Sequence, residues 1–252
     1  EGRPHLDMLP PARRLWRDTM SGGERSCRLV ALEEALLGFR RAGDVPGFEI
    51  PGRYFEFLRT GHAELLEPVF EHNRLDLLSL AVLTARAQRL VREGPAATSD
   101  ARECLALGRI YERAGRPEAA EDAYRAAVGH AVTDRASAEH AWYALARLLR
   151  RRRRHGDAAQ AWRELLRHTD RRGARGREAV EALAVHHEHR ERDLVLARAL
   201  AQRALAAERD EAKRTALRHR LVRLDRKLAA VRDARADLPA VSSPLPWHVG
   251  EA

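Results

Sequence analysis

Apolar residues recur with helical spacing along most of the chain. Leu29, Leu32 and Leu36 share one face of a predicted helix that ends at Gly38. Prolines at helix starts and glycines at helix ends predict further helices at 10–17 and 51–60. After Gly61, another predicted helix ends at Phe70 and a last one covers 72–90. A turn is predicted at 44–47. The short apolar segment His5–Leu9 is expected to be a strand.

From Ala101 onward, the pattern of large and small residues repeats every 38 residues. Such a period predicts stacked units of two helices, in which a large-small pair lets the helices approach and a residue of the second helix fills the gap. Leucines at helical spacing from Leu217 to Val231 predict a closing helix. The repeated positions are Leu107-Gly108, Leu145-Ala146 and Leu183-Ala184; Tyr111, Leu149 and His187; Ala120, Ala158 and Leu196; and Tyr124, Trp162 and Leu200.

This pattern resembles the tetratricopeptide repeat. The first unit fits the family pattern well, with Gly115-Arg116-Pro117 at the turn between its helices. The third unit departs from it, because His187 and Leu200 stand where aromatic residues are usual. A period of 38 exceeds the usual one and predicts extended loops. We interpret Trp142 and Trp162 as core residues of the repeats.

Charge separates the two parts of the chain. The 252 residues carry a formal net charge of +9, and 33% of them are charged. Residues 1–95 are neutral overall, whereas residues 96–252 carry the whole excess, much of it between Arg147 and Arg177. The run Arg150, Arg151, Arg152, Arg153 and Arg154 predicts contact with nucleic-acid phosphates. A solvated helix end is the other interpretation.

A segment rich in glycine, proline and serine, Glu93–Ser99, marks a domain boundary. We predict a first domain at 1–93, a linker at 94–100, repeats with a closing helix at 101–236, and a loose tail at 237–252. Prolines argue against regular structure in that tail, and its Trp247 is expected to be exposed.

Other classes of protein lack support in the composition. No apolar stretch is long enough to cross a membrane, so no membrane partner is expected. Two cysteines, Cys27 and Cys104, lack metal-site spacing and suggest a reducing, cytoplasmic compartment. No glycine-rich phosphate loop or nucleophile elbow occurs. The segment His186–His189 is not expected to bind a metal, because a helix splays adjacent residues apart.

One candidate site lies at the end of the first domain. His72 and Asp76 are four residues apart, so a helix places both side chains on one face. A carboxylate can bind a hard divalent cation, and an imidazole one turn away can orient or deprotonate a metal-bound water. A second interpretation is an ordinary surface pair that contributes about 0.3 kcal/mol to stability, and the spacing alone favours it.

The segment from about Pro4 to Leu90 also carries a series of spaced blocks: His5-Leu6-Asp7, Ala12–Trp16, Ser26–Leu29, Leu32-Glu33, Leu37–Arg41, Asp44–Gly47, Ile50-Pro51, Tyr54-Phe55, Leu58-Arg59, and His72-Asn73 to Asp76–Leu80. In this order they resemble the YprB-type proteins of the ribonuclease H-like DEDD exonuclease superfamily, some of which carry carboxyl-terminal tetratricopeptide repeats. The resemblance implies an α/β domain with a mixed sheet. It also implies two Mg²⁺ or Mn²⁺ ions, held by four acidic residues, that cut a phosphodiester from a 3′ end.

The resemblance assigns roles to single positions. Asp76 matches the last acidic metal ligand of the family, and His72 matches the water-orienting position, where tyrosine is usual at this spacing. Asn73 matches the family pattern without an assigned role. Asp7 is expected to have a structural role at a strand end.

The first two acidic motifs of the family have no counterpart in this chain and would lie upstream of Glu1. One carboxylate cannot hold two metal ions. The expected fold is therefore mostly α: the carboxyl-terminal part of an α/β ribonuclease H-like domain, with its first strands missing, followed by an α-solenoid of about three tetratricopeptide-like helix pairs.

Two functions remain open. One is a fragment, inactive by itself, of a metal-dependent 3′–5′ exonuclease-like protein that acts on DNA or RNA, with repeats that recruit substrate or a protein partner. The other is a non-catalytic tetratricopeptide scaffold with a degenerate nuclease-like domain.

Overall fold

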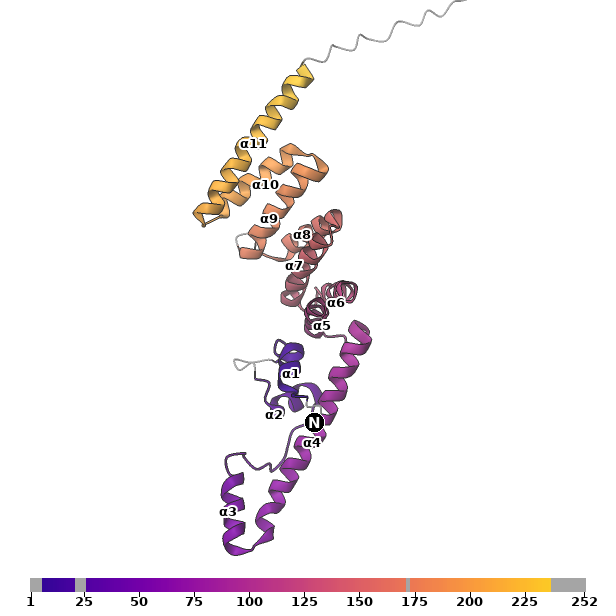
Figure 1. Cartoon of the computed structure of the whole chain (residues 1–252), viewed down its shortest axis with the longest axis vertical. Coiled ribbons are helices and arrows are strands. Elements are labelled where there is room, and N and C mark those ends of the chain that lie inside the picture. Colours follow the sequence, from indigo (N-terminus) through magenta and orange to yellow (C-terminus); the bar gives the residue numbers. More distant parts are fainter. Residues whose placement is uncertain (1–5, 21–25, 171–172, 237–252) are drawn as a thin grey trace, which may run out of the picture. The chain divides into compact units, whose positions relative to one another are not determined.

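The computed structural model describes residues 6–20, 26–170 and 173–236, and in these ranges it is mostly helical and contains no strand (Figure 1). The chain divides into two compact units, Glu1–Leu148 and Leu149–Ala252. This division differs from the predicted boundary at 94–100, which stays a prediction. The predicted tail at 237–252, with Trp247, lies outside the described residues.

Unit 1 contains short helices in its first part and longer ones after them. Its elements are α1 (Leu9–Trp16), α2 (Leu29–Leu32), the π-helix η1 (Glu33–Leu37), α3 (Ile50–Thr60), the 3-10 helix η2 (Ala63–Leu66), α4 (Glu67–Glu93), the 3-10 helix η3 (Gly94–Ala97), α5 (Ala101–Arg113), α6 (Pro117–Gly129) and most of α7 (Arg135–Arg151).

The strand predicted at His5–Leu9 is wrong in its described part. Residues 6–8 have no regular structure, and α1 already begins at Leu9. Two prolines in the first turn favour a helix start, because they lack the N–H groups that a helix leaves unpaired there. The Asp7 carboxylate accepts a hydrogen bond from the Leu9 N–H at 2.9 Å. Asp7 is thus structural, as expected, but at a helix start.

The helix break predicted between Phe70 and His72 is also wrong. α4 runs without interruption from Glu67 to Glu93, with a proline in its first turn and no glycine or proline after that. Consequently His72 and Asp76 lie inside a long regular helix, and their four-residue spacing translates directly into a shared face.

A buried carboxylate joins the parts of unit 1. The Glu103 side chain on α5 accepts hydrogen bonds from the indole Nε1 of the fully buried Trp16 at 2.8 Å and from Arg86 of α4 at 2.9 Å. It also accepts from Thr98, which follows η3. The predicted linker therefore lies against packed helices in this unit, and Tyr111 of α5 donates to the Val91 carbonyl at 2.9 Å.

Most positions that repeat every 38 residues are buried, but Leu196, the third-copy counterpart of Ala120 and Ala158, is 40% exposed. α5 and α6 pack so closely that a Cβ atom added to Gly108 would lie 2.3 Å from the ring of Tyr124. This close approach requires glycine at that position. The corresponding buried residues are Leu145, Ala146 and Trp162 in the second copy and Leu183, Ala184 and Leu200 in the third.

Unit 2 is a succession of packed helices. Its elements, after the end of α7, are α8 (His155–His168), α9 (Ala174–His186), the π-helix η4 (His187–Glu191), α10 (Leu194–Ala207) and α11 (Glu211–Ala236). α8 packs on α9, α9 on α10, and α10 on α11. The helix expected at Leu217–Val231 lies within α11, and its Leu217 and Leu224 are buried.

An ion-pair cluster fixes α11 to η4. Glu188 is fully buried, and its carboxylate receives Arg220, Arg223 and Lys227 of α11 at 2.9–3.0 Å. Burial acts to raise the pKa of Glu188, but the hydrogen bonds from Arg223 and Lys227 and the charges of Arg223 and His189 prevail and lower it to about 2. The carboxylate therefore stays ionised and holds three cations.

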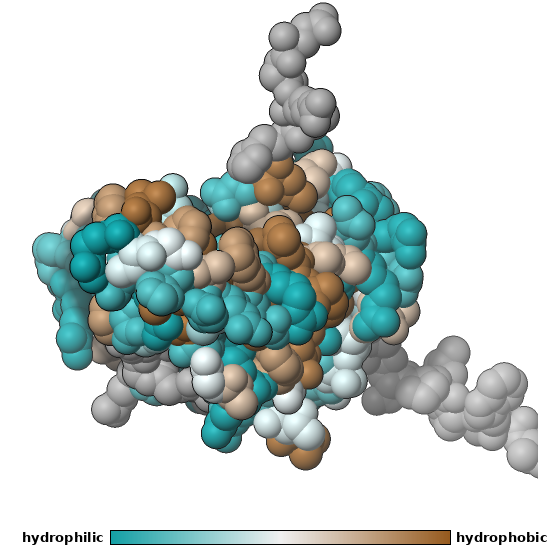
Figure 2. All heavy atoms as spheres, turned by 90° about the horizontal axis from the view of Figure 1, so that it is seen from below, coloured by the Kyte–Doolittle hydropathy of each residue, from teal (hydrophilic) through white to brown (hydrophobic). Residues whose placement is uncertain are grey.

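Many large apolar side chains of unit 1 are exposed. On α3 and α4 these include Phe55, Leu58 and Leu77, the last with 71% of its surface accessible. Figure 2 shows hydrophobic residues reaching the surface among hydrophilic ones. Among the described residues, no helix combines the length and the apolarity that crossing a bilayer requires.

Replacement of Gly108 by alanine tests the contact between α5 and α6. The added methyl group would collide with the Tyr124 ring, so we expect the free energy of unfolding to fall by about 1–3 kcal/mol. Gly129→Ala is the control, because nothing lies within 4 Å of its added Cβ. Urea unfolding followed by circular dichroism measures both. Equal stability of the two variants would contradict the close packing.

Replacement of Glu188 by glutamine tests the attachment of α11. Because the folded pKa lies below the unfolded value, the ionised carboxylate stabilises the fold above about pH 4.5, and this stabilisation disappears as the pH falls towards 2. At pH 7 we expect Glu188→Gln to lower the free energy of unfolding by about 3 kcal/mol. The deficit should shrink between pH 5 and pH 3 in chemical unfolding.

Glu211→Gln is the matched control, since this exposed glutamate also pairs with an arginine of α11. It should leave stability almost unchanged at every pH. A pH-independent effect of Glu188→Gln would show that packing, not charge, holds α11.

Candidate functional site

The structure brings the two predicted site residues together on α4. The His72 Nε2 lies 3.6 Å from the Asp76 Oδ2, one helical turn along the same face. His72 is largely buried and Asp76 is 36% exposed. The pair therefore meets the geometric expectation, and Asp76 is open to solvent on one side.

A loop residue completes a row of three groups. The Nδ1 of His72 lies 2.7 Å from Oδ1 of Asp44, in the loop between η1 and α3. Since an ionised carboxylate can only accept, the imidazole carries its proton on Nδ1 and turns Nε2 towards Asp76. Asp44 also accepts from the Val45 N–H at 2.9 Å, which fixes its carboxylate.

Arg41 lies at the centre of this arrangement with only 3% of its side chain exposed. Its Nε and Nη2 bind the two oxygens of Glu33 at 2.8 and 2.6 Å in a bidentate pair. Nη2 also donates to Asp76 Oδ1 at 2.6 Å, and Nη1 to Asp44 Oδ2 at 3.1 Å. We call Glu33, Arg41, Asp44, His72 and Asp76 the Arg41 cluster.

Local sequence explains how Arg41 reaches this position. The π-helix η1 ends at Gly38, whose φ of +63° is a left-handed conformation that favours glycine. The chain reverses there and returns Arg41 over Glu33 at the start of η1. Glu33 is fully buried and also hydrogen-bonds Ser79 of α4.

Charge and burial oppose each other in the Arg41 cluster. Burial acts to raise the pKa values of Glu33 and Asp44, but hydrogen bonds from Arg41, with Ser79 for Glu33 and His72 for Asp44, hold both pKa values below the usual range. The pKa of Arg41 is raised, chiefly by its bond to Glu33. Three carboxylates and one guanidinium leave the cluster negative overall.

The described residues do not fit a two-metal centre. Within them, no group of three or more histidine, cysteine, aspartate or glutamate side chains has metal-binding geometry. One oxygen of Asp76 is bound by Arg41 and the other faces His72. A cation at Asp76 would stand beside a buried guanidinium, and the other carboxylates of the Arg41 cluster, Glu33 and Asp44, are already bound by Arg41.

The arginine run has mixed surroundings. It begins at the last residues of α7 and continues through the turn before α8, where Arg153 adopts a left-handed φ of +60°. Arg154 binds Asp157 at 2.6 Å, and Arg151 and Arg152 also have interaction partners. Arg150 lines a pocket of unit 2 with Trp162. The run is therefore partly neutralised within the protein itself.

The histidines at the end of α9 share one acid. His186 Nε2 and His187 Nδ1 lie 3.0 and 2.8 Å from the two oxygens of Glu191. Burial is the main cause that lowers the pKa of His187. The hydrogen bond between His186 and Glu191 joins the end of α9 to η4.

Comparisons with known proteins match the first part of the chain to one superfamily. Residues 1–88 match the family model of the RNase H superfamily. The chain is also 28% identical over 228 residues to the uncharacterized protein YprB of Bacillus subtilis, an alignment that covers 90% of this chain and 53% of that protein. The chain thus spans about half the length of the curated relative it matches. No solved structure matches significantly.

Removal of Arg41 should destabilise unit 1. Arg41→Met would leave the buried Glu33 without its cation, and we expect the free energy of unfolding to fall by about 3–5 kcal/mol. Arg40→Met is the matched control, since among the described residues its exposed side chain pairs with the exposed Glu34 alone; about 0.5 kcal/mol or less is expected. Urea unfolding measures both. Similar effects would show that Arg41 does not organise the cluster.

Proposed function

We propose, from the match of residues 1–88 to the RNase H superfamily, that this chain is the carboxyl-terminal portion of a metal-dependent 3′–5′ exonuclease-like protein acting on nucleic acid. The observation that carries the proposal is the meeting of His72 and Asp76 on α4 inside the matched segment. The relative's greater length supports a larger protein.

In the complete protein, Asp76 would supply one acidic ligand and His72 would orient the attacking water. Bound divalent ions, Mg²⁺ or Mn²⁺, would supply an activated water and stabilise phosphate charge. The remaining carboxylates would come from segments outside this chain, and Asp76 would exchange its contact with Arg41 for the ion. By itself, the chain is proposed to be inactive.

Exposed apolar residues of unit 1 agree with this proposal. The side chains of Phe55, Leu58 and Leu77 cost free energy in water, at about 25 cal/mol per Å² of apolar surface. The first strands of the nuclease-like domain, proposed to lie outside this chain, would provide a surface to cover them.

The helix pairs from Ala101 to Ala236 are proposed to be tetratricopeptide-like repeats that recruit nucleic acid or a protein partner. The buried large-small pairs Leu145-Ala146 and Leu183-Ala184, one 38-residue step apart, support this proposal. The run Arg150–Arg154 is proposed as a phosphate contact, which its partial exposure permits.

A non-catalytic scaffold is the second candidate, and one observation favours it. Asp76, which matches the last acidic ligand of the family, forms an ion pair with the buried Arg41 and so has a purely structural partner. The coding DNA upstream of Glu1 separates the two candidates. An in-frame Asp-x-Glu strand followed by the second acidic motif supports the nuclease, and a start codon near Glu1 supports the scaffold.

A nuclease assay tests the proposal on the protein. The purified chain, with Mg²⁺ or Mn²⁺ and 5′-labelled DNA or RNA, should leave the substrate intact. A polypeptide extended by the upstream acidic motifs should shorten the substrate from its 3′ end. In this polypeptide, Asp76→Asn should reduce the activity at least 100-fold.

Metal-dependent degradation by the short chain itself would contradict the proposed inactivity. An extended chain that is inactive, or equally active with Asp76→Asn, would contradict the proposed role of Asp76.

A further inference from the structure

The positive charge of the protein resides in unit 2. Residues 149–252 contain 25 arginines and lysines and 15 aspartates and glutamates, for a net charge of +10, whereas residues 1–148 have a net charge of −1. Arginine accounts for almost all of this charge, and its planar fork matches the geometry of phosphate oxygens. A ligand bound by charge is therefore expected on unit 2.

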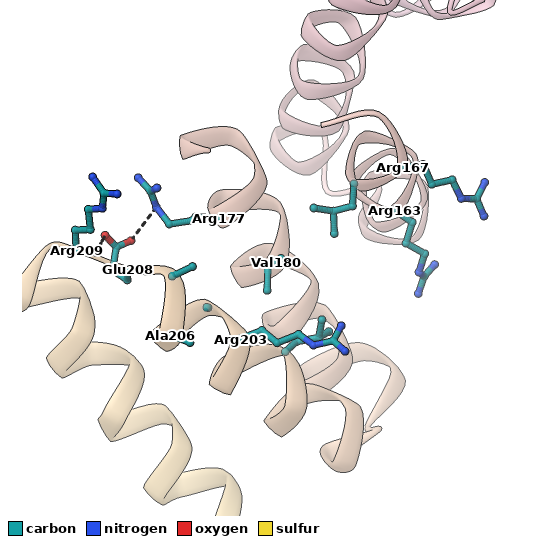
Figure 3. Close-up of a pocket in the computed structure, with 12 residues that line it drawn as sticks. Arg163, Arg167, Arg177, Val180, Arg203, Ala206, Glu208 and Arg209 are labelled. Carbon is teal, nitrogen blue, oxygen red and sulfur yellow. Dashed lines mark hydrogen bonds and ion pairs between the residues drawn. The ribbon is translucent and has the colours of Figure 1, made fainter. Parts of the chain in front are cut away.

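An open pocket of about 740 Å³ in unit 2 gathers five of these arginines. Figure 3 shows them coming from α8, α9, α10 and the turn after α10. We call this feature the arginine pocket, with Arg163, Arg167, Arg177, Arg203 and Arg209 on its walls. Glu208 is the one acidic residue that lines the pocket among the described residues, so the walls carry a clear positive excess.

Two of the five arginines have unused charge. Arg163 binds Glu191 at 2.9 Å, Arg167 binds Glu164 at 2.7 Å, and Arg177 lies 3.8 Å from Glu208. For Arg203 and Arg209, both exposed, no side-chain ion pair forms with any described residue. Surface arginines are usually solvated singly, but here Arg203 and Arg209 line one concavity together with three others.

The floor of the pocket is aliphatic. Val180 and Leu200 are more than nine-tenths buried and present apolar surface between the arginines. A ligand that suits both features has regularly spaced anionic groups and flat or apolar parts that can lie on the floor. Single-stranded nucleic acid has this chemistry, since its phosphates alternate with sugars and accessible bases.

We propose that the arginine pocket binds the backbone of single-stranded DNA or RNA, with Arg203 and Arg209 each on a phosphate. The proposal rests on the proposed function only for the class of ligand. In this proposal, most phosphate contacts lie outside the run Arg150–Arg154. Three residues of that run already have partners within the chain. An acidic peptide is the competing occupant.

The experiment measures binding of a fluorescein-labelled 20-nucleotide single strand to the full chain by fluorescence anisotropy. EDTA is present, so that cleavage plays no part. The test variant is Arg203→Gln/Arg209→Gln. The matched control is Arg226→Gln/Arg232→Gln, which removes the same charge from exposed positions of α11. Circular dichroism verifies that each variant is folded.

We expect the test variant to bind about tenfold or more weakly at 0.1 M salt, and the slope of log affinity against log salt to fall by about 1.4, for two phosphate contacts. The control should change affinity less than threefold. Equal weakening by both variants would show a diffuse charge effect and would overturn the pocket.

A third variant, with Arg150 to Arg154 changed to glutamine, separates the inference from the proposed function. If only this variant loses affinity for the oligonucleotide, the arginine pocket is not the binding site, but the proposed recruitment of nucleic acid stands. If the chain binds no oligonucleotide but binds a fluorescein-labelled polyglutamate peptide through Arg203 and Arg209, the ligand class is overturned. A failed nuclease assay on the extended chain would leave the pocket untouched.

Discussion

A buried guanidinium constrains the first unit of this protein. Arg41 cannot lose its charge and has almost no contact with water, so carboxylates must surround it. They come from three separate places: the start of η1, the loop before α3, and α4. This requirement fixes the loop against α4, orients His72 through Asp44, and gives Asp76 a partner that is not a metal.

The same constraint bears on the proposed metal site. A pair of divalent ions needs several acidic oxygens that are not already neutralised. Here Glu33 and much of Asp44 and Asp76 are engaged by Arg41, and the described residues add no further acid. An additional set of carboxylates would have to compete with a well-bonded cation, so completing the site involves rearranging the ion pairs as well as adding ligands.

The two units differ in charge and in what they offer a ligand. Unit 1 is nearly neutral and displays apolar surface, which suits contact with more polypeptide. Unit 2 is strongly basic and holds its last helix through a carboxylate buried among three cations. A concavity lined by arginines on this unit suits a polyanion. Recognition and chemistry would then reside in different parts of the chain, with charge steering the ligand to the repeats.

Local rules predicted much of the helical structure, including the shared face of His72 and Asp76. The strand at His5–Leu9 failed because two adjacent prolines favour a helix start more strongly than a short apolar run favours a strand. Arg41 and Asp44 were visible only as parts of a family block, because their partners lie up to 35 residues away and depend on the reversal at Gly38. Arg203 and Arg209 stand in no run of basic residues, so only the fold shows that they line one pocket.

Isothermal titration calorimetry with Mn²⁺ and the purified chain tests whether Asp76 pairs with Arg41 and not with a metal ion. The account predicts no saturable binding at micromolar concentration, for the natural chain and for Asp76→Asn alike. Tight binding of two ions per chain that disappears in Asp76→Asn would contradict it, because a complete metal centre would then exist within this chain.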